Sequence, residues 1–113
     1  MLRLPRESTI QNRCVEMIRA DGWWAEKIHV DAMQSRGLPD VVACMAGTFY
    51  GIEFKRPRKK PTDMQKYHIG EIRKAGGRAG VITEVWQMSA VLVAIRGPVA
   101  PPFLTEDDDD DYW

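Results

Sequence analysis

The chain has 113 residues, which is enough for one domain with a single modest hydrophobic core. Its 16 basic and 16 acidic residues cancel, but residues 106–111 are all acidic, so residues 1–105 carry 16 basic against 10 acidic side chains. A basic body favours an anionic partner. No apolar stretch approaches membrane-spanning length and no secretory leader pattern is found, so we expect a cytoplasmic protein without a membrane partner.

The two cysteines, Cys14 and Cys44, both lie in apolar runs. No CxxC pair or Cys/His cluster accompanies them, which argues against a zinc site and against a disulfide framework. We therefore expect both to be small buried side chains of a reduced protein.

The N-terminal part predicts a helix followed by a strand. Apolar residues at helical spacing indicate a helix over residues 7–20. Glu7 falls on the apolar face of this helix, where it either favours the helix dipole or points toward the sheet; the sequence leaves both open. Residues 23–30 have the aromatic and β-branched content of a strand, and its His29 is interpreted as a structural or exposed histidine.

The next segment has the pattern of an antiparallel hairpin. A Gly-Leu-Pro turn leads into Asp40, which begins the apolar run 41–46. A short linker at residues 46–48 can fold this run against the strand-like residues 52–55. Such a hairpin would bring Asp40 to the chain level of the second run.

Side-chain alternation in that second run gathers three charged groups. Glu53 and Lys55 project from one face of a strand, and the hairpin adds Asp40. Two carboxylates and a lysine on one sheet face pack poorly but suit a divalent metal ion. An isolated Asp40 would instead be interpreted as an ordinary turn residue.

A basic loop follows, because five of the six residues 55–60 are lysine or arginine. Pro57 and Pro61 exclude this stretch from helix and from central strand, so it is expected to be rigid and exposed. Both a solvated charge run and a phosphate contact fit the pattern.

The remaining elements alternate helix and strand. Thr62 and Gln65 form a capping-box pattern at the start of a helix over residues 62–75, which is a sufficient structural reason for Gln65. Residues 79–83 suit a buried strand parallel to the preceding one. The apolar helix 85–95 has more apolar surface than one core face needs, so part of it is expected to contact another subunit.

These residues in this order resemble the VRR-NUC family of the PD-(D/E)xK nuclease superfamily, most of all its small standalone phage and bacterial members. The resemblance spans about residues 7–96 and depends on Asp40 after proline, Glu53-Phe54-Lys55 and a helical Gln65. It implies an α/β, restriction-endonuclease-like core of α-β-β-β-α-β-α order, with a mixed sheet flanked by helices. The domain is placed at residues 1–98, and residues 99–113 are expected to be a proline-rich and acidic flexible tail.

The resemblance also implies a function. It predicts a metal-dependent, structure-selective DNA endonuclease that acts as a homodimer, most of all on four-way (Holliday) junctions. Asp40 and Glu53 would bind Mg²⁺, for which Mn²⁺ can substitute, together with the Phe54 backbone carbonyl and, through water, Glu7. Lys55 would position the attacking water, and Glu7 and Gln65 would complete the catalytic site from two helices.

DNA contacts are assigned to exposed basic side chains, namely Arg36, Arg56, Arg58, Lys59 and Lys60. No base-reading helix is apparent, which favours recognition of DNA shape, and the site of action would be the bacterial host cytoplasm if the protein is phage-encoded. The alternatives are a nickase or flap nuclease accessory to phage replication or packaging, and a non-catalytic DNA-binding module. In the last of these, the acids would form ion pairs with Arg36 and Lys55.

Overall fold

The protein is built on a four-stranded mixed sheet, with strand order β1-β2-β3-β4. The computed structural model describes residues 5–29 and 36–96. In chain order the elements are α1 (Glu7–Ala20), β1 (Trp24–Lys27), β2 (Val41–Met45), β3 (Thr48–Phe54), α2 (Asp63–Lys74), β4 (Arg78–Ile82) and α3 (Val85–Arg96). The first three strands are antiparallel, whereas β4 runs parallel to β3. The predicted element order and mixed sheet are therefore confirmed.

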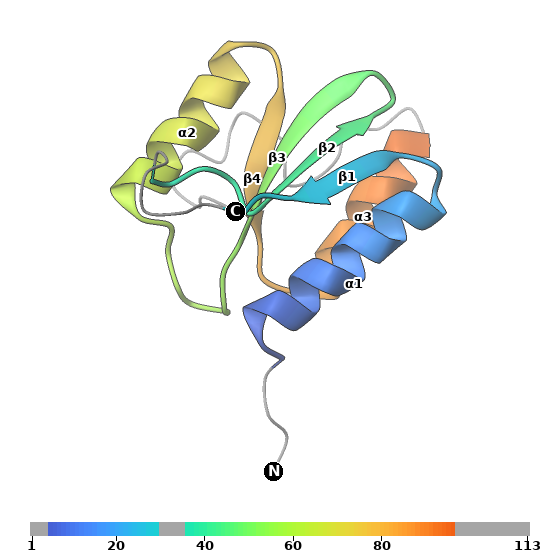
Figure 1. Ribbon diagram of the computed structural model, residues 1–113, viewed down its shortest axis with the longest axis horizontal. Coiled ribbons are helices and arrows are strands. Elements are labelled where there is room, and N and C mark those ends of the chain that lie inside the picture. The colour runs from blue at the N-terminus through green and yellow to red at the C-terminus, as the bar shows by residue number, and fades with distance from the viewer. Residues whose placement is uncertain (1–4, 30–35, 97–113) are drawn as a thin grey trace.

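Helices cover the two faces of the sheet unequally. Figure 1 shows α1 and α3 on one face and α2 on the other. The larger hydrophobic cluster lies under α1 and α3 and includes Ile18, Phe54 and Met88. A smaller cluster under α2 is built from Ile69 and from β4. Since β3 lies between both layers, its C-terminal half is buried on both faces.

A two-residue turn sets the register of the central hairpin. Ala46 and Gly47, with φ of 51° and 79°, both adopt the left-handed conformation that a primed turn between antiparallel strands requires. The resulting register pairs Val41 with Ile52. The second strand begins at Thr48, earlier than the expected run, and it ends at Phe54.

On each edge strand of the sheet, one backbone carbonyl accepts a hydrogen bond from an arginine of the preceding helix. Arg19 Nη2 and Nε donate to the Ala25 carbonyl at 2.9 and 3.2 Å, and Arg73 Nε donates to the Ala79 carbonyl at 3.1 Å. In each case the arginine precedes its acceptor by six residues. Unpaired edge carbonyls are a template for pairing with another chain, so these bonds protect β1 and β4 from edge-to-edge association.

The two cysteines differ in burial. Cys14 is buried, and burial raises the pKa of its thiol to about 12. Cys44 is exposed, so the expectation that both cysteines are buried is wrong for this one. It lies on the face that bears α2, but α2 packs on β3 and β4 and leaves the β1–β2 half of that face open. The domain boundary near residue 98 and the tail 99–113 lie outside the described residues.

Within the part of the chain that the structure describes, no helix has both the length and the apolar character needed to cross a membrane.

The edge bonds predict a measurable effect of Arg19→Met, which keeps the aliphatic stem and removes both donors. We expect a loss of about 1 kcal/mol in the free energy of unfolding, because a charged donor to a partly buried carbonyl is lost. The accompanying ion pair with Glu26 is exposed and contributes little. Urea denaturation and light scattering measure stability and association. Arg13→Met on the exposed side of α1 is the control, and equal behaviour of the two variants would contradict the role in edge protection.

Candidate active site

The hairpin brings Asp40 to the end of β3. One step beyond the Val41–Ile52 pair, the register places Asp40 opposite Glu53. The Asp40 Oδ2 atom accepts a hydrogen bond of 2.9 Å from the Phe54 backbone N–H. Because the N–H and C=O of one strand residue point to the same side, the Phe54 carbonyl also faces the Asp40 side of β3. The expected approach of Asp40 to the second strand is therefore found.

Two glycines hold the turn that carries Asp40, and their role was not foreseen in the sequence. A Cβ atom on Gly37, whose φ is 80°, would lie 2.5 Å from the carbonyl carbon of Met64 in the first turn of α2. A Cβ atom on Gly51 would lie 2.7 Å from Ile72 Cδ1 and 3.0 Å from Pro39 Cγ. The turn is thus packed against both α2 and β3, which places Asp40 rigidly.

Glu53 is the buried charged side chain among the described residues, with 3% of its surface exposed. Burial raises its pKa to about 9, and a hydrogen bond with Asp40 and the negative charges of Asp40 and Glu7 act in the same direction. The positive charge of Lys55 lowers the pKa but does not compensate. At neutral pH and without a cation, Glu53 is therefore a neutral acid that shares a proton with Asp40.

Glu7 reaches the same end of β3 from α1. Its Oε2 atom accepts a hydrogen bond of 3.3 Å from the Arg56 backbone N–H, just past the strand. Figure 1 shows the N-terminal end of α1 beside the segment that connects β3 to α2. Of the two interpretations that the sequence left open, the structure shows the second, in which Glu7 points toward the sheet and its charge acts on Glu53.

Lys55 lies directly after β3 and is half-buried. Its backbone N–H donates to the Ile82 carbonyl at 3.1 Å, which continues the pairing with β4 and fixes the chain direction. Its ammonium group is close enough to influence the charge state of Glu53. The structure thus gathers Glu7, Asp40, Glu53 and Lys55 at the C-terminal end of β3.

The Gln65 side chain caps the N-terminus of α2 together with Thr62. Its side-chain Oε1 accepts from the Thr62 N–H at 2.8 Å, and Thr62 Oγ1 accepts from the Gln65 N–H at 3.2 Å. This is a complete capping box at the start of α2. Within the described residues, the Gln65 side chain makes no hydrogen bond to the acidic groups at the end of β3, so its catalytic role stays a prediction.

The oxygen atoms at the end of β3 have the chemistry that a divalent cation requires. Carboxylate and carbonyl oxygens suit Mg²⁺. The proton between the adjacent carboxyl groups of Asp40 and Glu53 is one that a bound cation would displace. In the described segments, no three His, Cys, Asp or Glu side chains converge in a metal-holding arrangement. The residues therefore fit a site with Asp40 and Glu53 as direct carboxylate ligands and Glu7 farther away.

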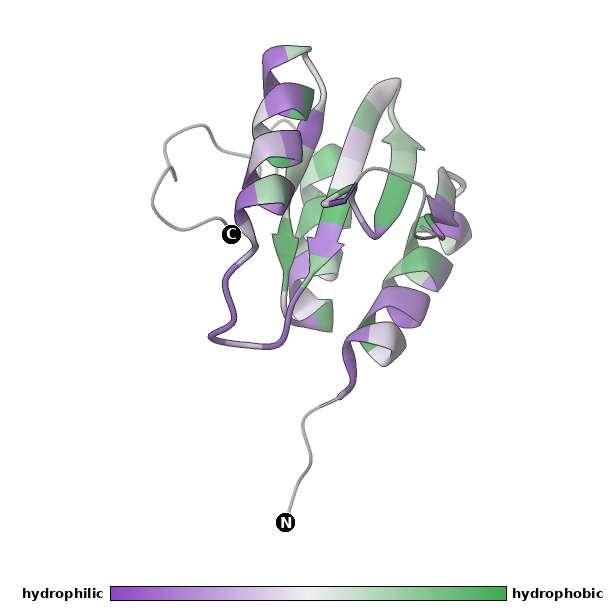
Figure 2. Ribbon diagram, turned by 60° about the vertical axis from the view of Figure 1, so that its left-hand side comes forward, coloured by the Kyte–Doolittle hydropathy of each residue, from purple (hydrophilic) through white to green (hydrophobic). Residues whose placement is uncertain are grey.

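The basic residues predicted to contact DNA are all exposed, namely Arg36, Arg56, Arg58, Lys59 and Lys60. Those of the loop are displayed by a turn in which the Lys59 N–H donates to the Arg56 carbonyl at 3.0 Å. Figure 2 shows the hydrophilic stretch from the end of β3 through this loop into α2. Within residues 5–29 and 36–96, neither Asp40 nor Glu53 forms an ion pair with Arg36 or Lys55, contrary to the non-catalytic alternative.

One loop residue adopts a costly backbone conformation. Arg58 has φ of 72° and follows Pro57, which corresponds to the third position of a type II turn. Glycine or asparagine is the usual residue there, and another side chain costs on the order of 1 kcal/mol. An arginine at this strained position is consistent with a need for its charge.

The sequence matches no protein-family model and no curated protein, but the fold is similar to solved structures. A structure described as a VRR_NUC domain has a TM-score of 0.66 and 22% identity, and the match covers 77% of this chain and 94% of that one. Hjc of Archaeoglobus fulgidus, a Holliday junction resolvase, has a TM-score of 0.50 and 20% identity, with 66% and 64% covered. The chain therefore has the restriction-endonuclease-like fold of the VRR-NUC domain.

Proposed function

We propose that this protein is a metal-dependent, structure-selective DNA endonuclease that hydrolyses phosphodiester bonds, with four-way junctions as substrate. The observation that carries the proposal is the convergence of Asp40, Glu53, Glu7 and Lys55 at one end of β3, beside an exposed basic loop. The fold similarity to a VRR_NUC domain and to a junction resolvase supports it.

Each residue has a chemical role in this proposal. Asp40, Glu53 and the Phe54 carbonyl would hold Mg²⁺ or Mn²⁺, and Glu7 would contribute through water. The bound ion would polarise the phosphate and make a bound water more acidic. Lys55, as a cation beside the carboxylates, orients the attacking water and offsets negative charge that develops on the phosphate. Gln65 would complete the catalytic site from the start of α2.

The basic loop supplies affinity for the sugar-phosphate backbone. Its four exposed cations, Arg56, Arg58, Lys59 and Lys60, neutralise phosphates without reading bases, and no base-reading element is found among the described residues. This arrangement favours selection of DNA by shape. Because two symmetric strands are cut in a four-way junction, a two-fold dimer would place one site at each.

The proposed dimer has a candidate interface on α3. This helix buries Met88, Val91 and Leu92 against the core, yet Trp86 and Val93 remain 63% and 65% exposed. A second exposed apolar row crosses β1, β2 and β3, where Trp24 pairs with Cys44 and Cys44 with Phe49. We propose α3 as the interface, because its exposed residues follow one helical face over two turns.

The proposal is tested by incubating the protein with Mg²⁺ or Mn²⁺ and labelled four-way junction, flap, nicked, linear duplex and single-stranded DNA. We expect paired symmetric nicks in the junction, and at least a 100-fold loss of rate in Asp40→Asn and in Glu53→Gln, because the metal ligands are weakened. Asp63→Asn, an exposed acid in the first turn of α2, is the matched control.

The outcomes of that experiment separate the alternatives. If Asp40→Asn cleaved DNA at the wild-type rate, Asp40 would not belong to the catalytic site. Cleavage confined to flaps or single strands would favour the accessory nuclease, as would a monomer by sedimentation at the assay concentration. Binding of junction DNA without cleavage of any substrate would favour the non-catalytic module.

The shared proton predicts a pH dependence of metal binding. The pKa of Glu53 is about 9 in the folded protein against 4.5 for the free group. The contribution of the protonated group to the free energy of unfolding is therefore complete below pH 4.5 and is lost as pH rises toward 9. A metal ion must displace this proton. We expect release of about one proton per bound Mn²⁺ at pH 7, and an affinity that rises about tenfold per pH unit up to pH 9.

Isothermal titration in two buffers of different ionisation enthalpy measures this proton release. Glu53→Gln has no proton to lose at this position and should show none. Binding of Mn²⁺ to the wild-type protein without proton release would show that the metal does not contact Glu53.

The strained backbone of Arg58 predicts opposite effects of its replacement on stability and on DNA binding. Arg58→Gly relieves the left-handed backbone, so we expect the free energy of unfolding to rise by up to about 1 kcal/mol while DNA affinity falls. Lys60→Gly, at a residue without positive φ, should lower both. Urea denaturation and fluorescence anisotropy measure the two quantities. A loss of stability in Arg58→Gly would contradict the assignment of strain.

A further inference from the structure

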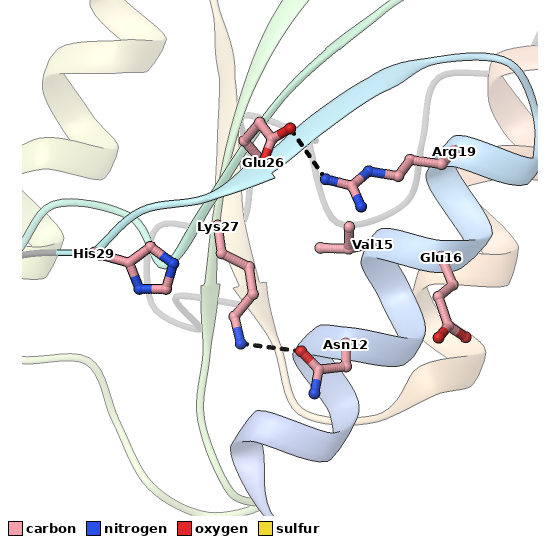
Figure 3. A pocket seen from close by; sticks show the side chains of 7 residues that line it. All are labelled: Asn12, Val15, Glu16, Arg19, Glu26, Lys27 and His29. Carbon is pink, nitrogen blue, oxygen red and sulfur yellow. Dashed lines mark hydrogen bonds and ion pairs between the residues drawn. The ribbon is translucent and has the colours of Figure 1, made fainter.

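A cavity of about 310 Å³ lies between α1 and β1, outside the residues assigned above (Figure 3). Its lining is Asn12, Val15, Glu16, Arg19, Glu26, Lys27 and His29. The two ends of this α1–β1 groove differ in chemistry. At one end Arg19 pairs with Glu26 at 3.1 Å, and at the other Lys27 Nζ donates to Asn12 Oδ1 at 3.0 Å.

The positive charges of Arg19 and Lys27 in the groove have different partners. The charge of Arg19 is met by the Glu26 carboxylate and by the Ala25 carbonyl. Lys27 is held by the neutral amide of Asn12, so its charge remains available to an anion, and one bond leaves two of its three ammonium protons. Figure 3 shows the Glu16 side chain directed away from Lys27.

The Lys27 end of the groove therefore presents hydrogen-bond donors to solvent. The Asn12 amide offers an NH₂ group, since its oxygen already accepts from Lys27. His29 is exposed and also lines the groove, and Figure 3 shows it on the opposite side of Lys27 from Asn12. A lysine with an adjacent amide NH₂ suits one phosphate group.

This end also lies next to the candidate active site. Lys27 pairs with Val41, and the N–H of the following residue, Ile28, donates to the Asp40 carbonyl at 2.8 Å. Asn12 follows Glu7 by five residues on α1, which is a rise of about 7–8 Å along the helix. The basic loop follows β3, whereas the groove borders β1, so in the strand order the Asp40 backbone lies between them. Lys27 projects from the same face as its partner Val41, under α1, and Asp40 projects from the opposite face.

We propose that the Lys27 end of the α1–β1 groove binds a phosphate of the cleaved DNA strand, on the side of the carboxylates opposite to the basic loop. Lys27 and Asn12 contact the phosphate directly. This inference rests on the proposed nuclease function, and it adds a second anchor that fixes the direction in which the strand crosses Asp40 and Glu53. Two anchors, one on each side, hold the scissile phosphate over the metal ligands better than the loop alone.

The test measures junction binding by anisotropy in EDTA, where cleavage is suppressed, between 50 and 200 mM salt. Loss of one phosphate contact should lower the slope of log K against log[salt] by about 0.9, which is a roughly tenfold weaker affinity at 0.1 M salt. We expect this for Lys27→Gln, with Lys27→Arg retaining most of the affinity. Lys74→Gln removes a lysine that is paired with Glu71 at the far end of α2, and it is the matched control. Thermal denaturation verifies that each variant is folded.

A single neutral methylphosphonate, moved along the strand, locates the contact. Wild-type protein should lose affinity at one position next to the cleaved bond, and Lys27→Gln should be insensitive at that same position only. Equal salt slopes for Lys27→Gln and Lys74→Gln, or full sensitivity of Lys27→Gln at every position, would overturn the groove proposal.

Failure of this inference is distinguishable from failure of the proposed function. If the wild-type protein cuts junctions and Asp40→Asn does not, while Lys27→Gln behaves like Lys74→Gln, the nuclease stands and the groove does not bind DNA. If the wild-type protein binds junctions without cutting them, the Lys27 measurements still decide the groove. Absence of any DNA binding would overturn both.

Discussion

The hydrogen bond from the Phe54 N–H to Asp40 Oδ2 is the constraint on which the site depends. It joins the residue before β2 to the last residue of β3, and so it holds the open end of the hairpin together. It also turns the Asp40 carboxylate toward Glu53 and leaves the Phe54 carbonyl on the same side. The Ala46-Gly47 turn at the other end of the hairpin sets the register that makes this bond possible.

Keeping the acid Glu53 in the candidate site lowers the stability of the fold. An ionisable group in the centre of a sheet is normally destabilising, and this one lies beside a second acid, so the folded protein retains a proton that the unfolded chain would release. A hydrophobic residue at this position would pack better between the two helical layers. The buried acid therefore lowers stability, which is consistent with the proposed role of Glu53 as a metal ligand.

The scaffold separates a closed part of the sheet from an open one. Arg19 and Arg73 each cover an edge carbonyl, which protects β1 and β4 from pairing with other chains. At the carboxyl end of β3, by contrast, the chain leaves the sheet into an exposed loop, and α1 contributes Glu7 there. The candidate site therefore lies at the end of the sheet where side chains of several elements meet.

The sequence by itself determined the element order, the extent of the helices, the exposed basic loop and the Gln65 capping box, because helical periodicity, proline and capping residues act over a few neighbouring positions. It also indicated that Asp40 would approach Glu53, since a short linker at residues 46–48 can fold the two runs into a hairpin. Only the tertiary structure decided that Glu7 points to the sheet, that Cys44 is exposed, and that Gly37 packs against α2. Those outcomes depend on how helices dock on the sheet, which brings together residues far apart in the chain and leaves no local pattern.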